Sequence, residues 1–284
     1  MQGTDILVNS PKNLMVRLRS NIEPLSPKLK TVATYIMENA PDVQFQTITD
    51  LARNTRTSEA TVVRLCRDLG YRGYSDFRMA LAVDLSQSAI TAPAPTDGSV
   101  CDVSAQNAIA ALEDTSKLID EKAVERICHR IHQATSVNCV GVGASGIVSR
   151  YLSYRLLRVG KRTQMFEDTH LAAMSAVRSS SEDLWFAISS SGSTKEVIHA
   201  VTQAYKNDVP IVLLTNINHS PLASVASEIL VAARPEGPLT GGAFASKVGA
   251  LLLVDVMINT LIQLYPEYKD VVQETAEVTV PLLI

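Results

Sequence analysis

Hydrophobic residues in the first 90 positions recur at the three- and four-residue spacing of helices. Leu29, Val32, Ala33 and Ile36 form one such stripe, and Ser26-Pro27 opens it as N-cap and first-turn residue. The same spacing predicts three further helices, near 47–54, 58–69 and 75–87. The pattern therefore predicts an all-α N-terminal domain over residues 1–85.

The composition changes between residues 86 and 104. This stretch is rich in Ser, Ala, Pro, Thr, Asp and Gly, and Pro93 and Pro95 argue against a helix running through it. We interpret residues 86–104 as a linker between two domains.

After the linker, short apolar runs alternate with helical patterns. Uninterrupted runs of this kind are typical of parallel strands buried on both faces by helices. Strands are expected at about 137–142, 162–166, 184–189, 210–215 and 228–232. Helices are expected at 105–117, 120–134, 146–159, 169–178, 194–207, 220–226 and 243–264. The sequence predicts an α/β C-terminal domain over residues 105–284, with a five-stranded parallel sheet flanked by helices and a flavodoxin-like order.

The composition bears on the cellular compartment of the protein and on whether it holds a metal. No apolar run reaches about 18 residues without a polar interruption, and the N-terminus lacks a signal pattern, so we expect a cytoplasmic protein without a membrane span. The four cysteines form no CxxC pair, and no His cluster has metal-ligand spacing, so we expect no metal site. Cys66 and Cys139 fall on apolar faces and are interpreted as reduced core thiols.

The charge is unevenly distributed along a chain whose net charge is −3. Residues 53–78 hold six arginines against three acidic residues, and a local basic face of this kind can contact nucleic-acid phosphates. The helices at 47–54 and 58–69, joined by a tight turn, favour a helix-turn-helix, with small Ala52 where the helices cross. The alternative is a helical bundle that only mediates dimerisation.

In a helix-turn-helix the second helix enters the major groove of double-stranded DNA. Arginine can donate two hydrogen bonds to guanine, threonine can contact a base or a phosphate, and free amides at the helix start favour phosphate oxygens. The turn often requires a left-handed residue such as Gly, and this chain has Arg56 there. The expected DNA-contacting residues are Ser58, Glu59, Ala60, Thr61, Arg64 and Arg67.

Two loops of the second domain have the composition of anion-binding sites. The first strand runs into Gly141-Val-Gly-Ala-Ser145-Gly146, and the third ends in Ser189-Ser-Ser-Gly-Ser-Thr194 before a helix. Hydroxyls, backbone amides and the helix dipole together favour a compact anion. Loops after adjacent parallel strands converge on one crevice, so the two loops favour a phosphate ester as ligand.

A nicotinamide dinucleotide is an alternative ligand. Residues 141–146 fit GxGxxG literally, and Glu167 lies at the end of the next strand, where a dinucleotide fold places its ribose-binding acid. A dinucleotide fold needs no second Ser-rich loop, and residues 189–194 therefore favour the sugar phosphate.

The motifs together resemble one family. Residues 47–81, and SEATVVRLCRDLGYRGYSDF within them, resemble the helix-turn-helix of the RpiR/MurR family of bacterial transcription regulators. Residues 137–232, with GVGASG and SSSGSTKE, resemble a sugar isomerase (SIS) domain, which that family carries at its C-terminus. The resemblance departs at Arg56-Thr57, where the family usually has Gly-Val, and at Ser246-Lys247, where it often has Ser-Arg.

The resemblance implies a DNA-binding regulator, expected to be a repressor of carbohydrate metabolism genes, that forms a homodimer or homotetramer on an operator. The implied effector is a phosphorylated sugar or sugar acid, with no cofactor. By the same resemblance the phosphate contacts are Ser145, Ser189, Ser191 and Thr194, with Ser190 contributing mainly through its backbone.

Catalysis is the remaining alternative, because SIS domains also occur in sugar-phosphate isomerases. Isomerisation needs a base beside a carbonyl, and the candidates near the crevice are Glu167, His170, Glu196 and His199. The Glu196–His199 pair is typical of a solvent-facing helix, so we expect a sensor with no enzymatic activity.

Overall fold

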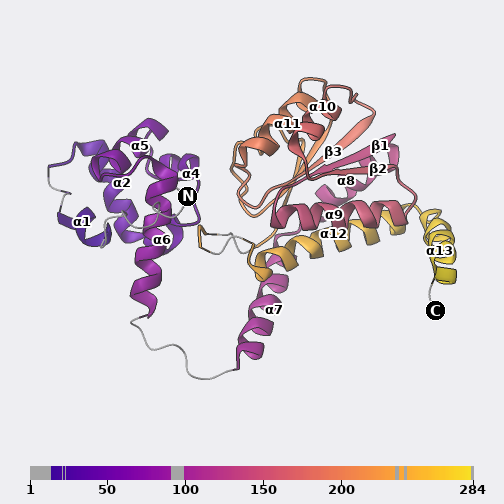
Figure 1. Cartoon of the computed structure of the whole chain (residues 1–284), viewed down its shortest axis with the longest axis horizontal. Coiled ribbons are helices and arrows are strands. Elements are labelled where there is room, and N and C mark those ends of the chain that lie inside the picture. Colours follow the sequence, from indigo (N-terminus) through magenta and orange to yellow (C-terminus); the bar gives the residue numbers. More distant parts are fainter. Residues whose placement is uncertain are drawn as a thin grey trace, which may run out of the picture. The chain divides into compact units, whose positions relative to one another are not determined.

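The chain folds into two compact units, and the boundary lies between Ser99 and Val100 except that Gly237–Gly241 belongs to the first unit (Figure 1). The computed structural model describes residues 14–20, 22, 24–90, 99–233, 237–239 and 242–282. Helix α6 (Tyr74–Ile90) extends past residue 86, and α7 (Val100–Leu118) begins before residue 104. Both ends of the predicted linker are therefore helical, because no breaker precedes Pro93 or follows Gly98; residues 91–98 lie outside the described residues.

The first unit is all helical, as the sequence predicts. Phe77 is fully buried at its centre, and Tyr71 and Tyr74 pack on the Phe77 ring at centroid distances of 5.6 and 6.3 Å. The expected helix 75–87 corresponds to α6. Two short helices, α1 (Leu14–Ser20) and α3 (Ala40–Val43), were not predicted. Besides α6, the unit comprises α1 (Leu14–Ser20), α2 (Pro27–Glu38), α3 (Ala40–Val43), α4 (Ile48–Asn54) and α5 (Glu59–Asp68).

The second unit contains a five-stranded sheet in the order β2-β1-β3-β4-β5, and every pairing is parallel. This confirms the predicted α/β domain with a five-stranded parallel sheet. The strands are β1 (Ser136–Val140), β2 (Thr163–Phe166), β3 (Asp183–Ile188), β4 (Ile211–Thr215) and β5 (Glu228–Val231). The helices besides α7 are α8 (Glu121–Gln133), α9 (Ala144–Arg158), α10 (Thr169–Ala176), α11 (Lys195–Tyr205), α12 (Phe244–Leu264) and α13 (Tyr268–Thr279).

Helices cover both faces of the sheet, and strand residues alternate between two cores. In β3, Leu184 and Phe186 pack in the core formed with α8, α9 and α12, whereas Trp185 and Ala187 pack in the core formed with α10 and α11. Successive strand side chains point to opposite faces, so a strand between two helical layers needs apolar residues at every position. Burial of both strand faces by helices therefore explains the short apolar runs in the sequence.

Two predictions for the second unit differ from the structure. Residues 221–225 form turns instead of the expected helix 220–226, because their amides reach back only three residues, as from Ala223 to Ser220 and from Val225 to Leu222. The amide of Leu222 instead donates to the carbonyl of Gly192 at 3.1 Å. Helix α13 was not predicted, and it packs beside the end of α9.

The cysteines divide into one exposed and three buried thiols, all reduced. Cys66, Cys128 and Cys139 lie in the cores, which confirms the interpretation of Cys66 and Cys139. Burial raises the pKa of each of these three thiols from 9.0 to about 12, because the thiolate would lose its hydration. Cys101 is exposed in the first turns of α7.

Candidate functional site

The helix pair α4–α5 begins with the capping geometry that its sequence predicts. Thr47 Oγ1 accepts from the amide of Asp50 at 3.1 Å, and Asp50 Oδ2 accepts from the amide of Thr47 at 3.0 Å. Arg53 then donates to Asp50 at 2.7 Å. The aspartate thus completes a capping box in a position where Glu is more usual.

The turn between α4 and α5 places Arg56 in the left-handed region, with φ of 53°. The amide of Thr57 donates to the carbonyl of Ala52 at 2.8 Å, and that of Arg56 donates to Arg53 at 3.0 Å. These two bonds form the Schellman motif that ends α4. Arginine therefore adopts the conformation that the position requires, at a cost of about 1–2 kcal/mol relative to ordinary backbone.

Helix α5 presents one apolar and one polar face. Val62, Leu65 and Cys66 are buried, whereas Arg64 and Arg67 are exposed and Thr61 is half-buried. The Arg64 side chain is 74% exposed, and its Nε lies at the long distance of 4.0 Å from Asp68 Oδ2. The arginine head groups are therefore available to an outside partner.

The residues that begin α5 have contacts within the unit. Ser58 Oγ caps the helix by accepting from the amide of Thr61 at 3.2 Å, and Glu59 accepts from Thr49 Oγ1 at 2.6 Å. Ala60 is exposed beside them. The structure thus brings all six predicted DNA-contacting residues to the first turns and outer side of one helix.

In the second unit, the Ser loop (residues 189–194) connects β3 to α11. Ser189 is 2% exposed, and its Oγ accepts from the amide of Gly192 at 3.1 Å and lies 3.1 Å from Thr194 Oγ1. Ser191 Oγ accepts from the amide of Ser193 at 3.2 Å. These two hydroxyls therefore shape the loop by accepting hydrogen bonds from its own backbone amides.

The last residue of β4 and the residues that follow it contact the Ser loop and hold it in place. The carbonyl of Ser190 accepts from Thr215 Oγ1 at 3.2 Å and from the amide of Asn216 at 3.1 Å. Gly192 has φ of 60°, and a Cβ there would lie 2.0 Å from Ser220 Oγ. These supports were not predicted from the sequence, although the polar pair Thr215-Asn216 at the end of a buried strand was a usable signal.

The Gly loop (residues 141–146) follows β1, which pairs directly with β3. A Cβ on Gly141 would lie 3.1 Å from the carbonyl of Ile188, so the two loops start side by side. Gly143 has φ of 56°, and half-buried Ser145 lies in the first turn of α9. The two loops therefore meet at the carboxyl edge of the sheet, where parallel α/β folds bind ligands.

The helices that follow the two loops have no side-chain cap at the N-terminus, a feature that they share with α12 and α13. Asp120 and Asp168 cap α8 and α10 through their carboxylates, whereas Gly143 and Thr194 give α9 and α11 no side-chain cap. The first amides of an uncapped helix carry partial positive charge and need acceptors. At α9 the amides of Ser145 and Gly146 already donate to the carbonyl of Val142, at 3.2 and 3.3 Å, so an anion would supply acceptors chiefly at the start of α11.

A cation also reaches the Ser loop. Lys247, in the first turn of α12, donates a hydrogen bond to Ser190 Oγ. This lysine stands where the family often has the arginine of a Ser-Arg pair, and its ammonium group lies against the serine hydroxyl. The side chain of Ser190 is thus part of the site, in addition to the backbone role expected for it.

The four acid-base candidates separate into two places. His170, Glu196 and His199 line a hollow of about 590 Å³ between α10 and α11, with Ala173 and Met174 as its apolar wall. Glu167 lies outside this lining, in an ion pair with Arg150. The carboxylate that a dinucleotide would need for its ribose is therefore engaged by an arginine.

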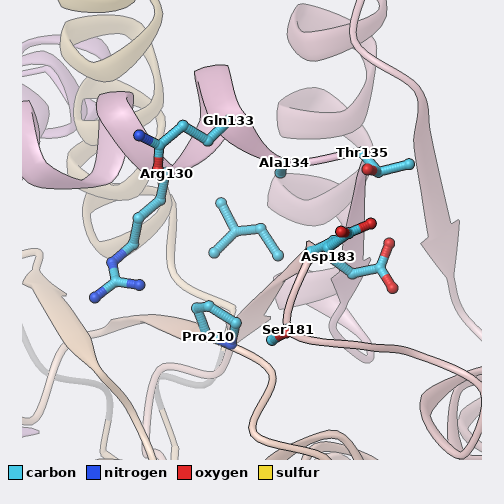
Figure 2. Close-up of a pocket in the computed structure, with 9 residues that line it drawn as sticks. Arg130, Gln133, Ala134, Thr135, Ser181, Asp183 and Pro210 are labelled. Atoms are coloured by element: carbon cyan, nitrogen blue, oxygen red, sulfur yellow. The ribbon is translucent and has the colours of Figure 1, made fainter.

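Another hollow, of about 360 Å³, lies at the amino ends of the strands (Figure 2). Arg130 and Gln133 of α8 line one side, and Asp183 at the start of β3 lines the other. It is therefore on the opposite edge of the sheet from the Ser and Gly loops. Within the described ranges, no group of three His, Cys, Asp or Glu side chains gathers with metal-binding geometry.

Comparison with known proteins gives both units a family. The helix-turn-helix domain of the rpiR family matches residues 12–88, and the SIS domain matches residues 130–260. The uncharacterized HTH-type transcriptional regulator YbbH of Bacillus subtilis is 30% identical over 246 residues, which cover 84% of this chain and 87% of YbbH. The HTH-type transcriptional regulator RpiR of Escherichia coli K12 is 29% identical over 231 residues, 79% of this chain and 77% of RpiR.

A solved structure is similar over nearly the whole chain. Vibrio vulnificus NanR, in complex with ManNAc-6P, is 72% identical and has a TM-score of 0.89, covering 95% of this chain and 99% of that one. The matches confirm the order of units expected from the sequence, with a helix-turn-helix before a SIS domain. The chain belongs to the rpiR family of helix-turn-helix transcriptional regulators.

Proposed function

We propose that this regulator represses carbohydrate metabolism genes and responds to the 6-phosphate of an N-acetylated amino sugar. The observation that carries the proposal is the 72% identity to NanR, whose structure contains ManNAc-6P, together with the anion-binding geometry of the two loops here. The proposal assigns DNA recognition to the first unit and effector binding to the second.

Effector phosphate would bind between the Ser and Gly loops. The uncapped amides at the start of α11, the hydroxyls and the Lys247 ammonium would supply donors on several sides of a tetrahedral anion. Lys247 would exchange the Ser190 hydroxyl for a charged acceptor, which forms the stronger hydrogen bond. The proposed phosphate-binding residues are Ser145, Ser189, Ser190, Ser191, Thr194 and Lys247.

The sugar portion would lie in the hollow between α10 and α11, next to the start of α11. His170 and Glu196 offer hydrogen-bond partners for ring hydroxyls, and Ala173 and Met174 offer an apolar wall for an acetyl methyl group. The same side chains were the candidates for catalysis. We assign them to binding, because a DNA-binding unit on the same chain gives the site a regulatory use.

DNA binding would use the exposed side of α5. Arg64 and Arg67 would contact base edges or phosphates in the major groove, and the capped start of α5 near Ser58 would face the DNA backbone. Effector must bind the free and DNA-bound conformations unequally to change operator affinity. Typical couplings of this kind change affinity by about 5- to 150-fold.

Thermal unfolding of the full chain with candidate ligands tests the proposal. ManNAc-6P should raise the melting temperature, whereas unphosphorylated ManNAc, glucose 6-phosphate, NAD and NADP should shift it much less. At 100 times its Kd a ligand adds about 2.7 kcal/mol to the free energy of unfolding. Replacing Ser189 with Ala should remove the shift, and replacing exposed Ser224 with Ala should retain it. A shift with NAD or NADP instead would contradict the proposal, and turnover of ManNAc-6P would contradict sensing without catalysis.

A further inference from the structure

Asn216, directly after β4, has backbone and side-chain hydrogen bonds to two different segments. Its amide donates to the carbonyl of Ser190 in the Ser loop at 3.1 Å, and its Nδ2 donates to the carbonyls of Ala232 and Ala233 at 3.0 and 2.9 Å. The residue is 9% exposed. A buried carbonyl that loses its donor is costly, so these bonds favour joint movement of the segments that they connect. Asn216 therefore couples the Ser loop to the residues after β5.

The residues after β5 are bonded in turn to α7. The amide of Ala233 donates to Thr115 Oγ1 at 3.0 Å, and Thr115 is fully buried. A Cβ on Gly249 of α12 would lie 2.5 Å from the same hydroxyl oxygen, so α7 and α12 approach closely at this point. The bonds therefore continue from the Ser loop to α7. We call the four residues that they join the relay: Ser190, Asn216, Ala233 and Thr115.

Two segments that the relay holds lead along the chain to the first unit. Helix α7 begins at Val100, and the residues before it belong to the first unit. Ala233 comes shortly before Gly237–Gly241, a segment that also belongs to the first unit. Two covalent connections between the units thus start from segments that the relay holds in the second unit.

We propose that the relay transmits occupancy of the Ser loop to these two connections, and that Asn216 and Thr115 are its positioning residues. The proposal rests on the proposed function, in which the effector phosphate binds in the Ser loop. That phosphate would draw the Lys247 ammonium from Ser190 Oγ, whereas the Ser190 carbonyl would keep its bond to the amide of Asn216. A change in the loop would then pass through the buried bonds to α7, since hydrogen-bond networks and rigid helices can carry coupling between distant sites.

The position of Thr115 separates the response to effector from the binding of effector. Thr115 contacts Ala233 and α12, and it lies in α7 rather than in either loop of the effector site. The Ser loop keeps its supports from Thr215 and Asn216 when Thr115 is replaced. A Thr115 variant should therefore bind effector with native affinity and transmit less of its effect to DNA.

DNA affinity with and without effector tests the relay in the full chain. The DNA probe is a duplex that the native protein selects from random sequences, and the effector probe is ManNAc-6P at saturation. Fluorescence anisotropy gives the two Kd values, and their ratio measures the coupling, which is typically about 5- to 150-fold. Isothermal titration gives the affinity for ManNAc-6P itself.

The central variant is Thr115→Val, because valine keeps the branched shape and removes the acceptor of the Ala233 amide. The Kd ratio should fall at least about threefold, while the affinity for ManNAc-6P should stay within about twofold of the native value. Thr115→Ser keeps the hydroxyl and should restore most of the ratio. Thr279→Val is the matched control and should keep the native ratio, since this exposed hydroxyl donates within α13 at 2.9 Å.

A double-mutant cycle with Asn216→Ala distinguishes one relay from separate structural damage. Asn216→Ala should also lower the Kd ratio. The double variant with Thr115→Val should lose little beyond the larger single loss, because both substitutions break the same series of bonds.

Hydrogen exchange of the native chain tests the relay without a substitution, and it replaces Thr115→Val if that variant fails to fold by circular dichroism. ManNAc-6P should change the exchange rate of the Ala233 amide at least about threefold. The amide of Ser227, just before β5, donates to Ile211 and should change less. An unchanged rate at Ala233 would overturn the inference.

Three results with the folded variants would also overturn it: a native Kd ratio in Thr115→Val, an equal loss in Thr115→Ser, or an equal loss in Thr279→Val. Multiplied losses in the double variant would do the same. Failure of the proposed function is a different result, because the native chain would then not bind ManNAc-6P in the titration. Failure of the relay alone leaves ManNAc-6P binding in place and the ratio of Thr115→Val unchanged.

Discussion

Lys247 donates a hydrogen bond to Ser190 and thereby joins the first turn of α12 to the loop between β3 and α11. These residues are 57 positions apart in the chain, so the bond connects two segments that no local sequence pattern relates. A phosphate in the loop would compete for the same ammonium group. The start of α12 is therefore the part of the domain best placed to register whether the crevice is occupied.

Replacing Lys247 with Gln should weaken effector binding by about tenfold or more, which corresponds to at least about 1.4 kcal/mol. Lys247→Arg should retain most of the affinity, because it keeps the positive charge. Isothermal titration with ManNAc-6P measures both, and Lys206→Gln at the exposed end of α11 is the control. Equal affinity of the Gln variant and the native protein would contradict the role of Lys247.

Replacing Arg64 with Ala should weaken operator binding by about 1–3 kcal/mol and relax discrimination among operator sequences. Effector binding should stay unchanged, because the substitution lies in the other unit. Fluorescence anisotropy with operator and scrambled duplexes measures the effect, and Arg178→Ala, an exposed arginine of the second unit, is the control. Unchanged discrimination would contradict the assignment of α5 as the recognition helix.

Replacing Arg56 with Gly should stabilise the helix pair by about 0.5–1 kcal/mol, because Gly adopts the left-handed conformation without the steric cost. Gly70 ends α5 in the same hydrogen-bonding motif with φ of 89°, so Gly70→Arg should destabilise by a similar amount. Native-state hydrogen exchange of α4 and α5 amides reports both changes. If the α4 and α5 amides exchanged more slowly in Gly70→Arg than in the native protein, the left-handed position would not carry the predicted steric cost.

Replacing Gly192 with Ala should abolish effector binding, because the new Cβ would lie 2.0 Å from Ser220 Oγ and 2.5 Å from its Cβ. The loop would have to move away from the turn that supports it. Gly73→Ala is the control, since nothing lies within 4 Å of a Cβ there. The prediction fails if both variants show the same ManNAc-6P melting shift as the native protein.

The burial of three of the four thiols has consequences for their reactivity and for the pH dependence of protein stability. Burial raises the pKa of Cys66, Cys128 and Cys139 to about 12, so at neutral pH only Cys101 should react rapidly with a thiol reagent. Above about pH 9 the unfolded chain loses thiol protons that the folded chain retains, so these groups lower the stability as pH rises from about 9 towards 12. Cys128→Ala with Cys139→Ala should make the alkaline fall in melting temperature shallower. Rapid reaction of the Cys101→Ser variant would show that the buried thiols are accessible.

Elements with strong local signals were predictable from the sequence. The Thr47–Asp50 cap, the apolar runs of β1, β3 and β4 and the Ser loop all follow from contacts or spacings within a few residues. The segment 220–226 has helical apolar spacing but forms turns, because Leu222 bonds to Gly192, 30 residues earlier. Its structure was decided by a distant backbone carbonyl that no local pattern reveals.

Part of the candidate site was equally inaccessible to sequence reasoning. The hydroxyls and glycine of the Ser loop predict an anion site, but the contacts that stabilise the loop come from Thr215 and Ser220, which lie far from it in the sequence. Helices α1 and α3 are seven and four residues long, too short for a clear periodic stripe. Their position is set by packing in the helical core.

Thr115 is, with Ala111, one of the two buried residues that hold α7 against the second unit. Its hydroxyl accepts from the amide of Ala233 at 3.0 Å and abuts Gly249 of α12, whereas α7 from Val100 to Asn107 is exposed along its whole length. The sixteen residues from Val100 to Thr115 form a rod of about 22 Å, so a rotation of about 10° at Thr115 would displace its tip by about 4 Å. That displacement is close to the rise of one DNA base pair, about 3.4 Å. A small tilt at the packed end of α7 would thus produce a larger displacement at its other end, which leads to the DNA-binding unit. That displacement would match the spacing of neighbouring base pairs in an operator.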